Sequence, residues 1–225
     1  MARELPIFPL PLVLFPGVPQ PLHIFEPRYR QLLADCLAGD RRFGIAYVTA
    51  TEQAEAAAVP NPGDVGCMAY IQSARELPDG RSDILTEGER RFVLLEWCPS
   101  DRLYRRARVE EFDDDPVDPA EAGPLASEVR DCFARVLSSF EGPVELPTDP
   151  TTLSFRVAGA LELEPGAKQA LQAERSTTLR LRRLVALLKP LAADAARHAV
   201  VRERARRNGR GAGEGGAHPE IERAS

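Results

Sequence analysis

The stretch LPIFPLPLVLFPGVPQPLHIF, residues 5–25, decides the fold of the first part of this chain. Proline recurs among its apolar residues and breaks the continuous helix that a signal peptide or a membrane anchor requires. Strands accept proline at their ends and edges. We therefore predict short extended pieces, LPIF, LVLF and LHIF, separated by proline and by a turn at Pro16 and Gly17.

The residues that follow predict one helix and then a series of antiparallel strands. From about Pro27 to Ala38, apolar side chains share one helical face, and Gly39 supplies a stop. Alternating apolar residues then indicate strands, and Asp79–Gly80 is a strong hairpin signal. The predicted strands cover residues 43–48, 65–77, 81–89, 91–97 and 103–112, with a second turn at Glu87–Glu89.

The second half of the chain changes character after Phe112. The segment DDDPVDPAEAGP, residues 113–124, carries charge, proline and glycine without periodicity, which predicts a boundary. Apolar residues with helical spacing follow, and Asp149–Pro150 has the signature of a helix start. Helices are predicted over residues 125–140, 150–163 and 165–175 and from Ser176 or Thr177 onward, where we expect Pro190 to kink or interrupt the last one.

These patterns predict an α+β protein with two domains and a tail. Residues 1–115 are the predicted β domain with one inserted helix, and residues 116–208 are the predicted helical domain. Residues 209–225 lack the apolar side chains that would offset the entropy of ordering, so we predict a disordered tail.

Composition narrows the range of functions. A net charge of -5 argues against a protein that coats nucleic acid or an anionic membrane with its whole surface, because both need a positive field. The chain has no run of about 18 apolar residues, so we expect no membrane span and no membrane partner. The cysteines form no C-x-x-C pair, which predicts free thiols in a reducing cytoplasm. They are Cys36, Cys67, Cys98 and Cys132.

No motif for catalysis or metal binding is convincing. The three histidines are isolated, whereas zinc sites need clustered Cys and His ligands. The patterns G-x-S-x-G, H-E-x-x-H and the phosphate loop are absent, so we expect no activated serine, no metalloprotease centre and no ATP binding by that loop. The sequence places no nucleophile or base beside His23. We predict no catalytic residue, no metal and no cofactor.

Two charged clusters each have a functional and a structural interpretation. The acids between Glu110 and Asp118 could give oxygen ligands to a divalent cation, but they lack the alternation and glycine of a calcium loop. The arginines between Arg197 and Arg210 could bind nucleic acid, but they also complement the C-terminal pole of the helix macrodipole. We favour a solvated linker for the first cluster and a basic helix end for the second.

The apolar residues of the proline-broken N-terminal stretch are the remaining candidates for a functional surface. A ribbon broken by prolines cannot bury both faces in a regular sheet, so we expect some side chains of this ribbon to line an exposed groove for another polypeptide. The alternative is that all of them pack in the core. The candidates are Phe15, Pro16, Pro21, Phe25 and Tyr29, with Arg28 at the rim.

The order of these motifs resembles the substrate-binding N-terminal domain of Lon proteases, over about residues 4–190. The family pattern runs Leu-Pro, Pro-Leu, apolar run, Phe/Tyr-Pro-Gly, Pro-Leu and helix start. It is matched here by Leu5–Pro6, Pro9–Leu10, Val13–Phe15, Phe15–Gly17, Pro21–Leu22 and Glu26–Tyr29. The stretch GCMAYIQSARELPDGRSDILTEGERRFVLLE, residues 66–96, is similar to the family's hairpin, and YRRARVEEF, residues 104–112, is similar to its closing strand.

This resemblance implies a PUA-like antiparallel pseudo-barrel in the β part and a helical bundle in the rest. Full Lon proteases continue into an ATPase module and a serine-lysine peptidase module, and this chain matches neither. The resemblance therefore implies a non-enzymatic module that holds apolar or unfolded polypeptide segments, is linked to proteolysis and uses no ATP.

The alternative function is RNA binding, because PUA-like folds also bind RNA and arginines recur on the predicted strands. Acids lie among these arginines and weaken that case, so we do not expect nucleic acid as the partner. The arginines are Arg75, Arg81, Arg90, Arg91, Arg105, Arg106 and Arg108.

Overall fold

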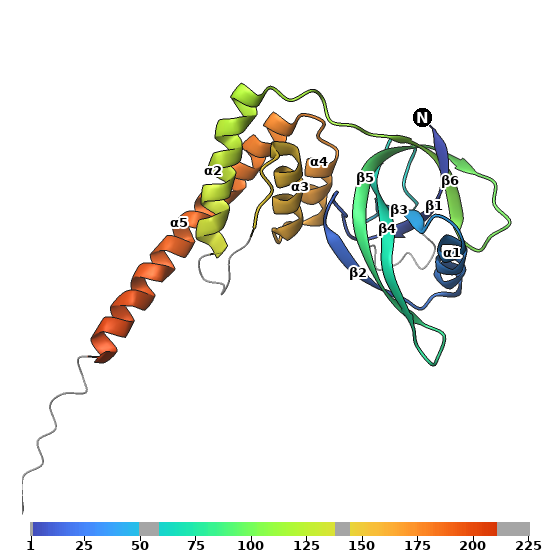
Figure 1. Cartoon of the computed structure of the whole chain (residues 1–225), viewed down its shortest axis with the longest axis horizontal. Coiled ribbons are helices and arrows are strands. Elements are labelled where there is room, and N and C mark those ends of the chain that lie inside the picture. The colour runs from blue at the N-terminus through green and yellow to red at the C-terminus, as the bar shows by residue number, and fades with distance from the viewer. Residues whose placement is uncertain (1, 50–58, 138–144, 211–225) are drawn as a thin grey trace, which may run out of the picture.

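The computed structural model describes residues 2–49, 59–137 and 145–210, with residues 198–210 described by their backbone only. Within these ranges the chain combines a six-stranded sheet with five helices, which confirms the mixed fold class (Figure 1). The strands are β1 (Arg3–Leu10), β2 (Pro19–Ile24), β3 (Arg42–Tyr47), β4 (Val65–Glu76), β5 (Ser82–Cys98) and β6 (Arg105–Glu111). The helices are α1 (Pro27–Ala38), α2 (Pro119–Leu137), α3 (Pro150–Ala160), α4 (Pro165–Gln172) and α5 (Thr177–Arg210).

The sheet closes on itself through its longest strand. Its order is β2-β5-β4-β3-β1-β6, and β5 also pairs with β6. The first part of β5 pairs with β2 and the last part pairs with β6, both antiparallel. The expectation of a wholly antiparallel β part is wrong at one place, because β1 and β3 are parallel. The chain between these two strands passes through β2 and α1, and this crossover lets β3 run beside β1 in the same direction.

Gly88 lies inside β5, so the predicted turn at Glu87–Glu89 is wrong. A Cβ atom on Gly88 would lie 2.2 Å from the carbonyl oxygen of Phe15, and the residue is glycine because the backbone comes so close. Two hydrogen bonds fix the contact, from the Gly17 N–H to the Gly88 carbonyl at 2.7 Å and from the Gly88 N–H to the Val18 carbonyl at 3.1 Å. The predicted hairpin turn at Asp79–Gly80 is confirmed, and Gly80 has a φ of +79°.

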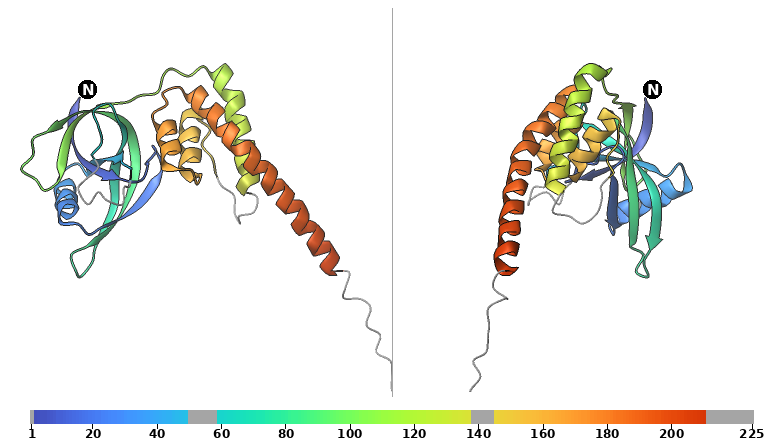
Figure 2. Two further views of the ribbon diagram at one scale, coloured as in Figure 1. Left: turned by 180° about the vertical axis from the view of Figure 1, so that it is seen from behind. Right: turned by 60° about the vertical axis from the view of Figure 1, so that its left-hand side comes forward.

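Helix α1 confirms the predicted apolar stripe and covers one end of the β part. Its buried side chains join a core cluster that includes Phe8, Phe43 and Ile71. They are Tyr29, Leu32, Leu33 and Cys36. Figures 1 and 2 show α1 on the side of the β part that is opposite to α3 and α4.

Helices α2 to α5 form a second half around their own apolar core, which also receives Phe15 from the first half. The predicted cap is present, since the Asp149 carboxylate accepts the Thr152 N–H at 2.7 Å. The connection between the two halves is shorter than the predicted segment 113–124, because α2 already begins at Pro119. Helix α5 continues through Pro190, so the predicted interruption is wrong, and the figures show it projecting past α2.

The predicted division at residues 115 and 116 falls in the connection between β6 and α2 and stays a prediction. Residues 211–225 of the predicted tail lie outside the described residues, whereas residues 209 and 210 end α5.

Candidate functional site

Phe15 and Tyr29, two of the predicted groove residues, are core residues. Phe15 is 0% exposed and packs in the core of the helical half, where its ring centroid lies 6.3 Å from that of Phe155. Tyr29 is 7% exposed and its ring lies 3.9 Å from Phe8 in the cluster under α1. The two side chains therefore belong to different cores and form no common groove.

Arg28 and Pro16 lie at two separate places on the surface. The Arg28 guanidinium lies 2.7 Å from the Glu26 carboxylate and 4.6 Å from the ring centroid of Tyr29, so it covers that buried ring. Pro16 is partly buried and lines a cleft between the two halves. Neither side chain lies beside Phe15 in an open groove.

Pro21 and Phe25, in contrast, share an exposed face. Exposed and less exposed residues alternate along β2 and the first part of β5, as in strands that have one covered face. Pro21 pairs with Leu85 and His23 pairs with Asp83, while Phe25 follows β2 and stacks on His23. We call this surface the β2 face. It consists of Pro19, Pro21, His23, Phe25, Asp83, Leu85 and Glu87.

A short ionic chain crosses the β2 face. Asp83 accepts hydrogen bonds from Arg75 at 2.7 Å and from the ring of His23 at 2.8 Å. The hydrogen bond from Arg75, followed by that from His23, holds the pKa of the Asp83 carboxyl below its usual range. His23 thus has partners on the strands and orders the surface around Phe25.

A cleft of about 660 Å³ lies between the β half and the helical half. It opens where β5 changes its partner from β2 to β6, and α3 provides the opposite wall. Its large apolar lining residues are Pro16, Met68, Phe112 and Phe155. The charged side chains that line it are Arg3, Arg42, Glu87, Glu89, Arg90, Arg91, Glu111, Asp113 and Asp114.

Arginines and phenylalanines alternate beside this cleft and join the two halves. The Arg91 guanidinium lies between two rings, 4.8 Å from the Phe112 centroid and 5.1 Å from that of Phe155. Arg175 covers the outer side of Phe112 at 5.2 Å, and Arg180 covers that of Phe155 at 4.0 Å. We call these five residues the arginine–phenylalanine stack.

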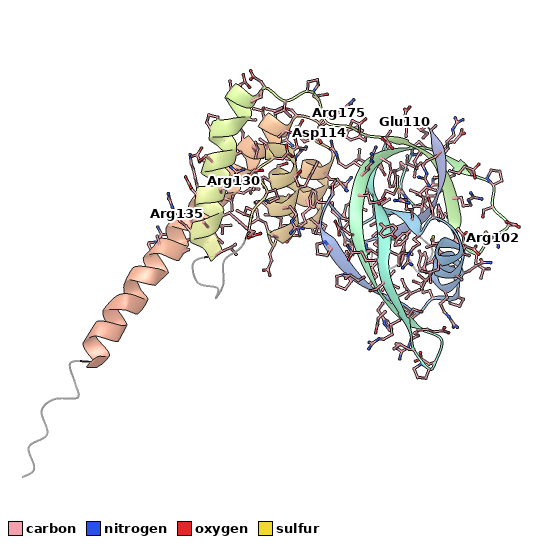
Figure 3. The ribbon with its side chains drawn as sticks, in the orientation of Figure 1. Arg102, Glu110, Asp114, Arg130, Arg135 and Arg175 are labelled. Atoms are coloured by element: carbon pink, nitrogen blue, oxygen red, sulfur yellow. The ribbon has the colours of Figure 1, made fainter. Side chains whose placement is uncertain are left out.

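Asp114 neutralises the buried part of this stack. Its Oδ1 lies 2.7 Å from Arg180 Nη2 and 3.2 Å from Arg91 Nη2, and the two arginine side chains are 0% and 2% exposed. Burial lowers the pKa of both guanidinium groups, and the charge of Asp114 opposes that shift. Figure 3 labels Asp114 and Arg175 where the connection passes from the β half to the helices. The interpretation of the acidic segment as a solvated linker is wrong for Asp114.

Sequence reasoning missed these arginines because charged side chains were assigned to the surface. For Arg180 a signal was present, since it stands four residues before the buried Leu184 and eight before the buried Leu188. This spacing places it on the apolar stripe of α5. Arg91 gave no comparable signal, because a bulge interrupts the alternation of β5 beside it.

The strand arginines of the RNA alternative mostly have acidic partners. Arg91 is buried, and Arg105 lies over the ring of Trp97 at 5.7 Å. Phosphate binding would have to compete with the ion pairs of the others. These pairs are Arg75–Asp83, Arg81–Asp79, Arg90–Glu111, Arg106–Glu4 and Arg108–Glu96.

In residues 2–49, 59–137 and 145–210, no group of three or more His, Cys, Asp or Glu side chains could hold a metal ion. Among the same residues, no helix is long and apolar enough to cross a membrane.

Comparison with known proteins identifies the family that this fold matches. The model described as "ATP-dependent protease La (LON) substrate-binding domain" matches residues 4–190, which confirms the resemblance found in the sequence. The crystal structure of a Lon N-terminal domain protein from Xanthomonas campestris has 27% identity and a TM-score of 0.61, over 82% of this chain and 98% of that one. The N-terminal domain of the Mycobacterium avium complex Lon protease shares the fold, with a TM-score of 0.65 at 19% identity over 85% of this chain and 99% of that one.

The curated relatives are much longer than this chain. Lon protease 2 of Herpetosiphon aurantiacus is 26% identical over 200 residues, and Lon protease 1 of Thermus thermophilus is 27% identical over 199 residues. Each alignment covers 82% of this chain but only 23% and 24% of the relatives. The chain thus spans about a quarter of the length of these proteins.

Proposed function

Because the chain belongs to the family of ATP-dependent protease La (LON) substrate-binding domains, we propose that it binds polypeptide segments and catalyses no reaction itself. The proposed segments are apolar stretches of unfolded or partner proteins. They bind without ATP and without nucleic acid, and the bound chain is passed on to proteolysis. We further propose that the closed β half is PUA-like and that α2 to α5 are a helical bundle, which the closure of the sheet and the separate core of these helices support.

The observation that carries this proposal is the exposure of Phe25. Phe25 is 58% exposed on the β2 face, which also contains Pro21 and the 37% exposed Leu85. Removing about 100 Å² of aromatic surface from water contributes about 2.5 kcal/mol before association costs. A few such contacts support binding in the micromolar to tens-of-micromolar range, with low sequence selectivity.

The edge of β2 favours contact through side chains over pairing with another strand. Among the described strands β2 pairs with β5 alone, so its other edge is free. Proline has no N–H and is tolerated in a paired strand where its nitrogen faces outward. The free edge at Pro19 and Pro21 therefore lacks the donors that an added strand needs, and the Pro21 carbonyl already accepts the Gln20 side chain at 2.9 Å.

The proposed site retains four of the predicted residues. Phe25 and Pro21 contact the bound segment, Arg28 forms the rim at the start of α1, and Pro16 lies at the cleft beyond the other end of β2. Phe15 supports the site from within the core of the helical half.

Fluorescence anisotropy of a labelled, permanently unfolded polypeptide, titrated with the full chain, tests this proposal. We expect Phe25→Asp to weaken binding at least about tenfold, because it places a charge on the apolar contact. Leu191→Asp is the matched control, since Leu191 is a 42% exposed leucine on α5 in the other half. No binding at tens of micromolar, or equal losses in both variants, would refute the proposed function.

A further inference from the structure

The β2 face leads directly into the cleft between the two halves. Asp83, Leu85 and Glu87 alternate with the buried residues of β5, so the three side chains lie on one face. Pro19 pairs with Glu87, which places that carboxylate at the end of the β2 face nearest the cleft. Glu87 also lines the cleft, together with Pro16. An extended polypeptide on the β2 face therefore reaches the cleft without turning.

The cleft keeps two carboxylates outside its ion pairs, an excess of negative charge that Arg180 reduces because it shares Asp114 with Arg91. Three of its arginines pair with acids that line it as well, and Arg3 pairs with Asp40. Among the described residues, Glu87 and Asp113 have no cation within 4.0 Å of their carboxylates, although Glu87 accepts a hydrogen bond from the Gln72 side chain and the Asp113 carbonyl accepts one from Arg175. The internal pairs are Arg42–Glu89, Arg90–Glu111 and Arg91–Asp114.

The charged residues next to the mouth of the cleft do not neutralise its excess of negative charge. An adjoining hollow contains Glu87, Glu145 and one cation, Arg156. Arg156 donates its hydrogen bond to the Gly17 carbonyl, and no ion pair joins it to either acid. The mouth therefore attracts positive charge, and its apolar walls can contact the methylene groups of a long basic side chain.

The wall of the cleft also holds a hydrogen-bond donor that lacks an acceptor. Within the described residues, Arg91 Nη2 is buried and makes no hydrogen bond, although Asp114 Oδ1 lies 3.2 Å away. The Nη1 of the same group donates to the carbonyls of Gln172 and Glu174, so the guanidinium is held in place. A buried donor without a partner is unfavourable.

From this arrangement we propose that the cleft recognises a basic side chain of the bound polypeptide. The preferred segment has an aromatic or aliphatic residue on the β2 face and a lysine or arginine in the cleft that Glu87 and Asp113 line. From Phe25 to Pro19 the strand spans about 20 Å at roughly 3.3 Å per residue, so the basic residue lies about six positions from the aromatic one. This inference rests on the proposed function, because it requires the same β2 face to hold the segment.

A pair of peptides tests the inference. Both are labelled, acetylated and amidated, with phenylalanine at the first position, leucine in the middle and either lysine or glutamine at the seventh. We expect the lysine peptide to bind about fivefold more tightly at low salt, the upper end for partly exposed ion pairs. The preference should shrink towards unity at 0.5 M salt, because exposed charges are screened.

Variants of the full chain assign the effect to the two carboxylates. In the double variant Glu87→Gln and Asp113→Asn, we expect equal affinity for both peptides. Glu121→Gln, an exposed acid in the first turn of α2, is the control and should keep the preference. Equal binding of both peptides to the unmodified protein overturns this inference and leaves the proposed function standing. A preference that survives the double variant overturns the assignment to these residues, and absence of binding by either peptide refutes both proposals.

Discussion

Asp114 lies 2.7 Å from Arg180, with its Oδ1 atom facing Nη2 of a side chain that is 0% exposed. The carboxylate belongs to the connection between the halves and the guanidinium to α5, so this ion pair fastens the connection to the helices. Arg91 shares the same carboxylate from β5. One acid therefore compensates two buried cations from different halves.

Asp114→Asn should lower the free energy of unfolding by about 3 kcal/mol, because it leaves two buried guanidinium groups without their counter-charge. Urea unfolding followed by circular dichroism measures the loss. Asp115→Asn is the control, since Asp115 is exposed and lies 3.6 Å from Arg175, and it should cost less than about 0.5 kcal/mol. Similar losses in the two variants would contradict the assigned role of Asp114.

Phe15→Ala and Phe25→Ala should have opposite effects on stability and binding. The first empties a fully buried site in the helical core and should cost about 3–5 kcal/mol. The second truncates a side chain that is 58% exposed, so it should cost less than about 1 kcal/mol while weakening polypeptide binding. Chemical unfolding and anisotropy on the same samples separate the two roles. A stable Phe15→Ala protein with impaired binding would contradict the assignment of Phe15 to the core and would indicate that Phe15 contacts the bound polypeptide.

Gly88→Ala should destabilise the protein by about 2 kcal/mol or more, because the new methyl group meets the backbone carbonyl of Phe15 at 2.2 Å. Backbone atoms cannot give way as a flexible side chain can. Gly123→Ala is the matched control in α2, where no other atom lies within 4 Å of the added carbon. There alanine should stabilise the helix by about 0.5–1 kcal/mol. Thermal unfolding of both variants gives the comparison, and a tolerated Gly88→Ala would disprove the close approach.

Tyr104 should ionise far above the usual range of tyrosine. Burial raises its pKa to about 12, and the hydrogen bond that its hydroxyl donates to Asp35 adds to the shift. Because the folded state favours the neutral phenol, this stabilisation is complete below about pH 10 and is lost as the pH rises towards 12. The difference in absorbance at 295 nm between the unmodified protein and Tyr104→Phe follows this titration. Ionisation of Tyr104 near pH 10 in the folded protein would contradict the prediction.

Local signals in the sequence predicted most of the elements. The stripe of α1, the Asp149 cap and the Asp79–Gly80 turn depend on neighbours within a few residues, and the structure confirms all three. The helix through Pro190 differs from the prediction. The local pattern predicts its start at Thr177. Pro190 removes one backbone hydrogen bond of the helix, but this loss alone does not end a helix.

The remaining features depend on residues far apart in the chain. Gly88 was predicted to lie in a turn. The need for glycine at this position comes from the backbone of Phe15, which is more than seventy positions away in the chain. Phe15 is buried because the helices of the second half pack around it, and no local pattern in the sequence shows where these helices lie. For the candidate site, Pro21 and Phe25 were predicted because an apolar ribbon that is broken by prolines cannot bury both faces in a regular sheet. Leu85 and Glu87 were missed because only the pairing of β2 with β5 places them beside that edge.

The prolines of β2 have a further consequence under the proposed function. Unfolded segments aggregate by stacking strand upon strand, and an open edge with free donors would seed such fibrils. With Pro19 and Pro21 on its outer edge, the β half can keep such a segment at its surface without serving as the first layer of an amyloid. If the proposed function is correct, the prolines of β2 keep the exposed apolar surface from pairing as a strand with the polypeptide that it binds.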